Sequence, residues 1–395
     1  MKPRLFSVLG LLSAALLGAT PDPFAALPQA VQPFVERGEI SGAVMLLATK
    51  DRVLTVAAVG QSDLASGRRM KTDDLFWIAS MTKPVTAVGL AILADEGRLS
   101  FDDPVEKFLP EFRGQWVMEE QSAGRRVLVA SPRPIKLRDL LTHTSGMGEY
   151  PVTEAHWTLA EMTKVVAREP LRFAPGSRWA YSTAGLDVLG RVIEVVSGEP
   201  FAAFLQKRVF APLEMTDTTF WLTPEQERRF AHNYRPGPAN GKLEETEIVY
   251  LYGGARTDQA RPALGGAGLF STAEDVAHFY QMMLGGGMWH SRRILKSETV
   301  AELTRKQTGD LVARPGMPWG LGFCVIEDPA KMEANATLSR GTFGHGGAHG
   351  TQSWADPTRG IIYVFMIQRA ALQPNPDDSP MRRAWQKAAA AVVVP

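Results

Sequence analysis

The chain of 395 residues is predicted to fold as an α/β protein of the α+β type, with one antiparallel sheet built from strands near both of its ends. Apolar runs rich in β-branched residues lie close to both termini, whereas amphipathic helical patterns and irregular segments fill the middle. A hydrophobic content of 45% with 22% charged residues is enough for a sizeable core. We therefore expect a sheet flanked by helices, a mostly helical insertion, and a functional cleft between the two.

The first 20 residues are predicted to be a secretory signal peptide that lies outside the fold. Lys2 and Arg4 precede an apolar run over residues 5–19, and prolines follow shortly after it. A charged start followed by an apolar run is the layout of an export signal, and this run is shorter than the ~20 residues of a membrane span. An uncleaved anchor is the alternative. The sequence thus predicts a secreted or periplasmic protein without a stable membrane span, folded over residues 21–395.

Strands and a closing helix are expected at the two ends of the folded chain. The predicted strands cover residues 44–48, 53–59, 321–326, 351–355 and 361–367, and the closing helix covers residues 379–391. The first two strands are close enough, around Lys50 and Asp51, to form a hairpin. Residues 21–100 and 265–395 would then form the α/β part, and residues 101–264 the helical or irregular insertion.

The insertion contains one strongly amphipathic helix. Over residues 184–196 five aliphatic side chains recur at helical spacing, and Gly198 and Pro200 end the pattern. The polar, Gly/Pro-rich stretch 235–242 is expected to be a surface loop. The mixed-charge stretch 119–126 is expected to be a solvated loop.

Composition excludes several classes of function. The formal net charge is +1, so neither nucleic acid nor an acidic membrane surface is an expected partner. The single cysteine, Cys324, rules out an internal disulfide and a multi-cysteine metal cage, and we expect it to be a small core residue in a strand. No cofactor is expected, and the oligomeric state stays open.

The segment from Phe76 to Pro84 is the strongest candidate for a catalytic centre. Proline is tolerated only in the first turn of a helix, which places Ser80 at a helix start, where free backbone N–H groups stabilise negative charge. Lys83 follows three residues later on the same helical face. A buried lysine with a lowered pKa can take the proton of a serine hydroxyl. The alternative is an N-capping serine beside a solvated lysine.

Three further segments occur in the order of a known family's motifs. They are Leu140 to Met147 (LLTHTSGM), Trp179 to Gly185 (WAYSTAG) and Phe343 to Thr351 (FGHGGAHGT). Together with the Ser-x-x-Lys segment, they make the chain resemble the serine β-lactamase and penicillin-binding protein family, and most closely its class C-like branch. That branch includes β-lactamases, D-alanyl-D-alanine carboxypeptidases, D-aminopeptidases and esterases. The resemblance covers roughly residues 34–368 and implies the β-lactamase/transpeptidase-like fold.

The resemblance assigns roles to single residues. It implies that Ser80 is the acylated nucleophile, that Lys83 activates it, and that Tyr181 is the general base or proton relay. Which of Lys83 and Tyr181 removes the proton stays open, and a core aromatic is the alternative for Tyr181. The backbone N–H groups of Ser80 and Ala348 would form the oxyanion hole, in which losing one donor costs about 10² to 10³ in rate.

Two substituted positions bear on the substrate. The resemblance implies substrate contacts from Thr183 and from His345, Gly346 and Gly347, where the glycines allow a close approach of the backbone. Thr183 stands where relatives usually have asparagine, and His345 stands where many have lysine. A hydroxyl does not reproduce an amide, and histidine is mostly neutral at pH 7 whereas lysine is charged. Both changes weaken the recognition of amide-linked, carboxylate-bearing substrates such as penicillins.

The sequence therefore favours an exported serine hydrolase that works through an acyl-enzyme on Ser80, with esters ahead of other substrates. A D-alanyl-D-alanine carboxypeptidase or D-aminopeptidase is one alternative, and a class C-like β-lactamase is another. An alternative of a different class is a non-catalytic relative that binds peptidoglycan or a partner protein. The expected partner of the enzyme is a small-molecule ester, an amide or a peptidoglycan-derived substrate.

Other candidate residues have simpler explanations. His143 is expected to make a structural hydrogen bond that shapes the cleft, rather than to act as a third catalytic residue. His345 and His349 lack a helix and a third ligand, so no zinc site is expected. Trp77 and Trp179 each lie close to a motif, and they could line an apolar acyl pocket or fill the core.

Overall fold

The computed structural model describes residues 22–122, 124–150, 156–239, 241–332, 336–372 and 379–392. The predicted signal peptide lies outside these residues. The helices are α1 (Ala26–Glu36), α2 (Thr82–Asp95), α3 (Leu137–Leu141), α4 (Leu159–Val166), α5 (Ala184–Ser197), α6 (Phe201–Leu205), α7 (Pro224–Arg229), α8 (Ala273–Leu284), α9 (Ser297–Thr304) and α10 (Pro380–Ala391). Within the described segments, none of these helices is long and apolar enough to cross a membrane.

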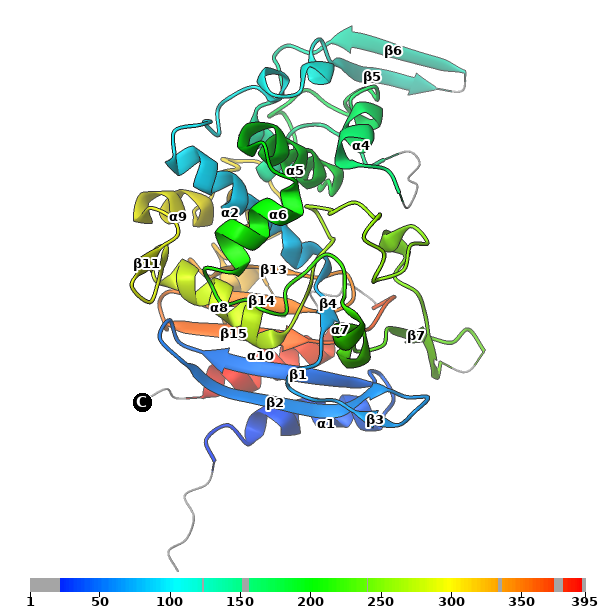
Figure 1. Ribbon diagram of the computed structural model, residues 1–395, viewed down its shortest axis with the longest axis vertical. Coiled ribbons are helices and arrows are strands. Elements are labelled where there is room, and N and C mark those ends of the chain that lie inside the picture. The colour runs from blue at the N-terminus through cyan, green and yellow to red at the C-terminus, as the bar shows by residue number, and fades with distance from the viewer. Residues whose placement is uncertain are drawn as a thin grey trace, which may run out of the picture.

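Strands from both ends of the chain pair in one antiparallel sheet, as the sequence predicted (Figure 1). Its seven strands follow the order β12-β13-β14-β15-β1-β2-β3. Their bounds are β1 (Gly42–Ala48), β2 (Val53–Asp63), β3 (Arg68–Arg69), β12 (Cys324–Val325), β13 (Phe343–Gly346), β14 (Gln352–Asp356) and β15 (Ile361–Met366). Val44 lies opposite Met366 and Ala48 opposite Ile362, so the N-terminal and C-terminal strands are direct neighbours.

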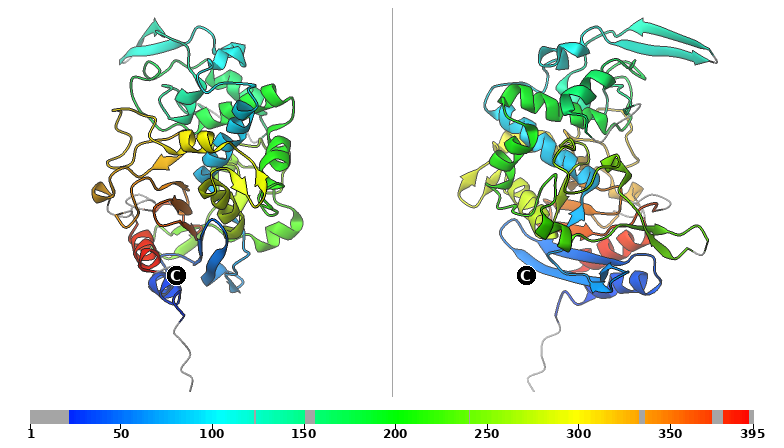
Figure 2. Two further views of the ribbon diagram at one scale, coloured as in Figure 1. Left: turned by 90° about the vertical axis from the view of Figure 1, so that its left-hand side faces the viewer. Right: turned by 45° about the vertical axis from the view of Figure 1, so that its right-hand side comes forward.

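Both faces of this sheet are covered, which explains why its central strands β1 and β15 are unbroken apolar runs. All seven residues of β1 are buried. Met45 and Leu47 pack with α1 and α10 on one face, whereas Val44 and Leu46 belong to the core that includes α2 and α8 on the other. Figure 2 shows α1 and α10 together on the outer side of the sheet. The closing helix is as predicted, with Ser379 accepting the Arg382 N–H as its cap.

The insertion packs on α2. Helix α5 contacts α2, α4 and α6, and the predicted apolar residues Leu186, Leu189, Val192 and Ile193 are fully buried. Gly198 adopts a left-handed conformation, with φ of 77°, and ends the helix as its C-cap. The predicted helix over residues 184–196 is therefore confirmed.

The structure corrects the loop expected over residues 119–126 and places the loop expected over residues 235–242 between two short strands. Short strands outside the main sheet are β4 (Phe76–Trp77), β5 (Trp116–Ser122), β6 (Arg125–Ala130), β7 (Tyr234–Pro236), β8 (Leu243–Glu245), β9 (Phe270–Ser271), β10 (Met288–Trp289) and β11 (Arg292–Arg293). The stretch 119–126 belongs to the β5–β6 hairpin, which projects from the body (Figure 1). Of the stretch 235–242, residues 235–236 pair in β7, and the described residues 237–239 and 241–242 lie in the loop that leads to β8, as expected. Such hairpins are difficult to predict from the sequence because their strands are exposed and rich in polar residues. Backbone hydrogen bonds hold the two strands together, so no alternation of apolar and polar residues is required.

The strand expected over residues 321–326 is shorter in the structure. Only Cys324 and Val325 pair with β13. Gly322 has φ of 82° and donates its N–H to Leu141 O at 3.0 Å, so the chain bends away from the sheet before the strand begins.

Candidate active site

Ser80 lies where α2 begins, as predicted. It is the middle residue of a 3-10 turn, η1 (Ala79–Met81), which continues directly into the helix. Pairing of β4 with β9 anchors this turn, and the Ile78 N–H donates to Leu269 O at 3.0 Å. Ala79 has φ of 48°, a left-handed conformation that costs a non-glycine residue about 1 kcal/mol. Packing thus holds a strained turn that presents Ser80.

Lys83 is fully buried behind Ser80. Its Nζ donates to Ser80 Oγ at 3.1 Å and to Gly266 O at 2.7 Å. Burial lowers the pKa of Lys83 to about 8, against the opposing effect of Asp187 and Glu149. In its neutral form the amine can keep the bond to Gly266 O and accept the hydroxyl proton of Ser80. The alternative of a solvated lysine is wrong, since the side chain has no contact with solvent.

Tyr181 lies against the Lys83 amine, and His143 lies against Tyr181. Lys83 Nζ is 4.7 Å from the centre of the Tyr181 ring, and the His143 ring is 4.4 Å from that ring. His143 Nδ1 accepts the Ser182 N–H at 3.2 Å, and complete burial keeps the pKa of His143 well below its usual range. His143 is thus a neutral side chain that holds the backbone beside Tyr181, which is the structural role expected of it. Tyr181 borders a cavity, so it is more than a core aromatic.

His345 and Gly346 lie on the open edge of β13. Strand β12 pairs only with Phe343 and Gly344, so the outer edge of the next two residues faces the cavity. His345 Nδ1 donates to Gly346 O at 2.6 Å. Gly347 follows, and a Cβ at this position would lie 2.7 Å from Ile78 O. Only glycine therefore lets this edge approach the turn that carries Ser80.

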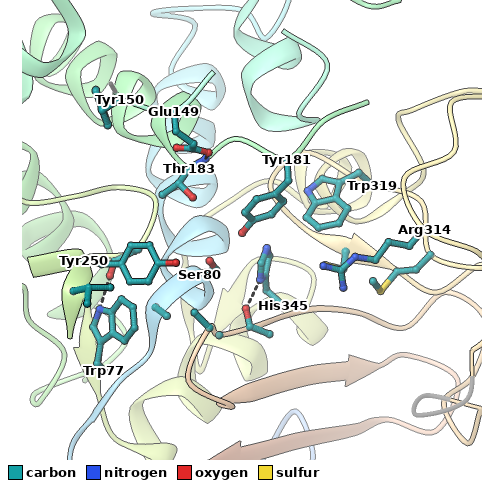
Figure 3. Close-up of a pocket in the computed structure, with 18 of the residues that line it drawn as sticks. Trp77, Ser80, Glu149, Tyr150, Tyr181, Thr183, Tyr250, Arg314, Trp319 and His345 are labelled. Carbon is teal, nitrogen blue, oxygen red and sulfur yellow. Dashed lines mark hydrogen bonds between the residues drawn. The ribbon is translucent and has the colours of Figure 1, made fainter. Parts of the chain in front are cut away.

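The predicted site residues meet at one cavity of about 610 Å³ (Figure 3). Its lining includes Ser80, Tyr181, Thr183, His345, Gly346, Gly347 and Ala348. Lys83 lies immediately behind Ser80. The two residues predicted to supply the oxyanion hole, Ser80 and Ala348, thus border the same space, where their N–H groups could act on one oxygen atom.

Trp77 and Trp179, the two tryptophans close to the motifs, differ in their position relative to the cavity. Trp77 borders the cavity, donates from Nε1 to Ala267 O at 2.6 Å, and stacks its ring on Tyr250 at 5.4 Å. Trp179 packs its ring 5.3 Å from the ring of Trp319, which borders the cavity. Trp77 is therefore part of the pocket wall, and Trp179 supports the wall from behind.

Three charged residues at the site, Glu149, Asp187 and Arg314, belong to none of the sequence motifs named above. The Glu149 carboxylate accepts the N–H groups of Thr183 and its neighbour at 2.6 and 3.0 Å, at the positive N-terminal end of α5. Asp187 is buried and accepts the Gly266 N–H at 2.8 Å, and burial raises the pKa of Asp187. Arg314 comes from the segment before β12 and borders the cavity. The carboxylate of Asp187, flanked by Leu186 and Val188 in the first turns of α5, is the one sequence signal here, and it could have pointed to Asp187 alone.

Metal ligation finds no support in the described segments, which contain no group of three or more His, Cys, Asp or Glu side chains placed to hold an ion. His349 packs edge-on against Trp77 at 4.7 Å, and burial lowers the pKa of His349 to about 4. Cys324 is buried in β12, as expected, and borders the cavity as well.

A serine at a helix start, with a buried amine bonded to its hydroxyl and a strand edge across from it, is the arrangement of a serine hydrolase. Within that class the antiparallel sheet of both chain ends, with its helical insertion, is the β-lactamase/transpeptidase fold. The chain belongs to the β-lactamase family, whose sequence profile matches residues 27–390.

Similar proteins point to more than one activity. Esterase EstB of Burkholderia gladioli is 32% identical over 401 residues, with 94% of each chain covered. A protein of Escherichia coli provisionally named D-alanyl-D-alanine carboxypeptidase is 29% identical, with 78% of this chain and 73% of that protein covered. The solved structure of EstCE1, described as a hydrolase with promiscuous acyltransferase activity, has a TM-score of 0.76 and 25% identity, with 93% of this chain and 98% of the other covered.

Proposed function

We propose that this protein is an exported esterase that hydrolyses small esters through an acyl-enzyme on Ser80. The observation that carries the proposal is the hydrogen bond from buried Lys83 Nζ to Ser80 Oγ at the wall of a cavity of about 610 Å³. A cavity of this volume suits a small substrate. The likeness to EstB, which is named an esterase, supports the same activity.

The reaction proceeds in two halves. In the first, Lys83 and Tyr181 take the proton of Ser80 while Oγ attacks the ester carbonyl carbon, and the N–H groups of Ser80 and Ala348 stabilise the oxyanion. The bond from that carbon to the alcohol oxygen breaks, and the alcohol leaves with the returned proton. In the second half, water attacks the acyl-enzyme by the same route, which releases the acid and restores the Ser80 hydroxyl.

Glu149 favours esters over substrates with an acyl-amide group. Its carboxylate lies against the backbone of Thr183, the position from which the family resemblance implies a contact to such an amide. A carboxylate and an amide carbonyl oxygen are both acceptors, so Glu149 offers no donor to the carbonyl oxygen of such an amide. The wall of Trp77 and Tyr250 suits an alkyl or aryl acyl group instead.

The ranking of substrates tests the proposal. We expect kcat/KM for 4-nitrophenyl butyrate to exceed that for nitrocefin by about 10- to 100-fold, after correction for the reactivity of each substrate with hydroxide. A D-Ala-D-Ala peptide should fall between them. Efficient nitrocefin hydrolysis with negligible ester hydrolysis would overturn this ranking. Faster release of D-alanine than of 4-nitrophenol would select the second candidate, a D,D-peptidase, which the Escherichia coli relative favours.

The pH dependence of ester hydrolysis follows from Lys83. The neutral amine accepts the proton, and its fraction rises as the pH passes the lowered pKa of Lys83, about 8. We expect kcat/KM for an uncharged ester to rise about tenfold per pH unit below this value and to level off above it. The pH profile is measured with 4-nitrophenyl butyrate. A profile that is flat on both sides of the Lys83 pKa would show that Lys83 is not the proton acceptor and would assign that role to Tyr181.

A further inference from the structure

A buried carboxylate and the Lys83 amine are bound to the same glycine. Lys83 Nζ donates to Gly266 O at 2.7 Å, and the N–H of Gly266 donates to Asp187 Oδ1 at 2.8 Å. Asp187 is 1% exposed and lies in the first turn of α5. The amine from α2 and the carboxylate from α5 are therefore joined through one backbone position.

The backbone of Gly265 and Gly266 is packed tightly between α2 and α5. Thr86 Oγ1, from α2, donates to Gly265 O at 2.7 Å. A Cβ on Gly266 would lie 2.6 Å from Thr183 O, so only glycine lets this backbone approach the start of α5 so closely. Asp187 binds the backbone at this point of closest approach and thereby fixes where Gly266 O lies.

The position of Gly266 O decides how the Lys83 amine is oriented. A neutral amine has one lone pair, and it can accept the Ser80 proton only when that lone pair faces Ser80 Oγ. Nζ is 3.1 Å from Ser80 Oγ, so an N–H bound to Gly266 O leaves the lone pair for the hydroxyl. Because the lysine side chain is a flexible four-carbon chain, the amine needs such a fixed acceptor to keep this orientation.

We propose that Asp187 is a positioning residue: it holds Gly266, and through Gly266 it keeps the Lys83 amine directed at Ser80. This inference rests on the proposed function, in which Lys83 accepts the Ser80 proton. Asp187 acts on Lys83 by its charge as well, because the negative carboxylate raises the pKa of the amine whereas burial lowers it. A variant that removes the charge but keeps an acceptor oxygen separates these two effects.

Other titratable groups also face the pair. Those near Lys83 are Glu149, Cys324, Tyr181 and His143, and Tyr150 is near Asp187. Burial keeps the pKa of His143 well below its usual range and that of Tyr150 well above it, so both are neutral while Lys83 titrates. All of these groups stay in place in the variants below, so a shift in the pH profile reports on Asp187.

Two substitutions of Asp187 test the proposal. In Asp187→Asn the midpoint of the pH profile of kcat/KM for 4-nitrophenyl butyrate should move down by about one pH unit, because the charge that favours the protonated amine is lost. In Asp187→Ala the acceptor oxygen is lost too, and the plateau above the midpoint should fall about 10- to 100-fold through kcat, with KM nearly unchanged. The plateau should fall less in Asp187→Asn, which keeps an oxygen for the Gly266 N–H.

Asp275→Asn is the matched control. Asp275 is another buried carboxylate in the first turn of a helix, α8, and burial raises its pKa to about 6. It accepts the Asp217 N–H at 2.9 Å and the Thr218 hydroxyl at 2.8 Å. Whatever its effect on Tm, this substitution should leave both the midpoint and the plateau unchanged.

The outcomes separate this inference from the proposed function. A midpoint that does not move in Asp187→Asn, or a plateau that does not fall in Asp187→Ala, would overturn the inference while the esterase proposal stands. If the unmodified protein does not hydrolyse the ester, the proposed function fails. If the Asp187 variants do not fold, Thr86→Val replaces them: it removes the bond to Gly265 O and should lower the plateau with the midpoint unchanged, and an unchanged plateau would overturn the inference.

Discussion

Ser80→Ala is expected to abolish labelling by a fluorophosphonate probe and to lower ester turnover by about 10³-fold or more. Ser80 Oγ lies at the cavity wall and accepts a hydrogen bond from the Lys83 amine. The variant removes this oxygen, which is the atom that would form the acyl-enzyme. The fold should survive, because α2 has no side-chain cap that the substitution could remove. Labelling is measured by intact mass, turnover with 4-nitrophenyl butyrate, and folding by the thermal midpoint Tm.

Ser66→Ala is the matched control for this experiment. Ser66 is exposed in the turn between β2 and β3, where its hydroxyl donates to Asp63. This variant should take up the probe like the unmodified protein. Labelling that persists in Ser80→Ala would place the nucleophile elsewhere, and an unmodified protein that takes up no probe would favour the non-catalytic binding relative.

Lys83→Met is expected to lower kcat/KM for esters by about 10² to 10⁴-fold while Tm stays equal or rises. Activity falls because the Ser80 hydroxyl loses its proton acceptor. Stability is retained because burial disfavours the charged form of Lys83, as its lowered pKa of about 8 shows, whereas methionine fills a similar volume without a charge. Both quantities are measured at one pH with 4-nitrophenyl butyrate and by thermal unfolding.

Lys107→Met is the control for Lys83→Met. Lys107 is exposed and forms an ion pair with Asp103 at 2.8 Å, which contributes little at a surface. Its substitution should leave kcat/KM unchanged. A Lys83→Met protein that keeps most of its esterase activity would contradict the role of the lysine and assign the proton transfer to Tyr181 alone.

Parts of the fold could be predicted because their signals are local. The apolar run of β1, followed by Lys50 and Asp51 and a second apolar run, indicates a hairpin. Pro84 is tolerated only in the first turn of a helix, so Ser80 must lie at a helix start. The β5–β6 hairpin was missed because its charged side chains resemble those of a loop, and its strands are defined only by each other. Strand β12 is shorter than predicted because Gly322 redirects the backbone toward Leu141, a contact that no local pattern encodes.

The sequence by itself determined which reacting groups the protein has and their order along the chain. Ser80 and Lys83 share one face of a helix start, and such a spacing fixes their contact wherever the helix lies. Tertiary structure alone decided the environment of these groups. The burial that lowers the pKa of Lys83, the position of Glu149 at the start of α5 and the position of Arg314 at the cavity all depend on segments far apart in the chain. Proton affinity and substrate choice follow from desolvation and from nearby charges, and both arise only when those segments pack together.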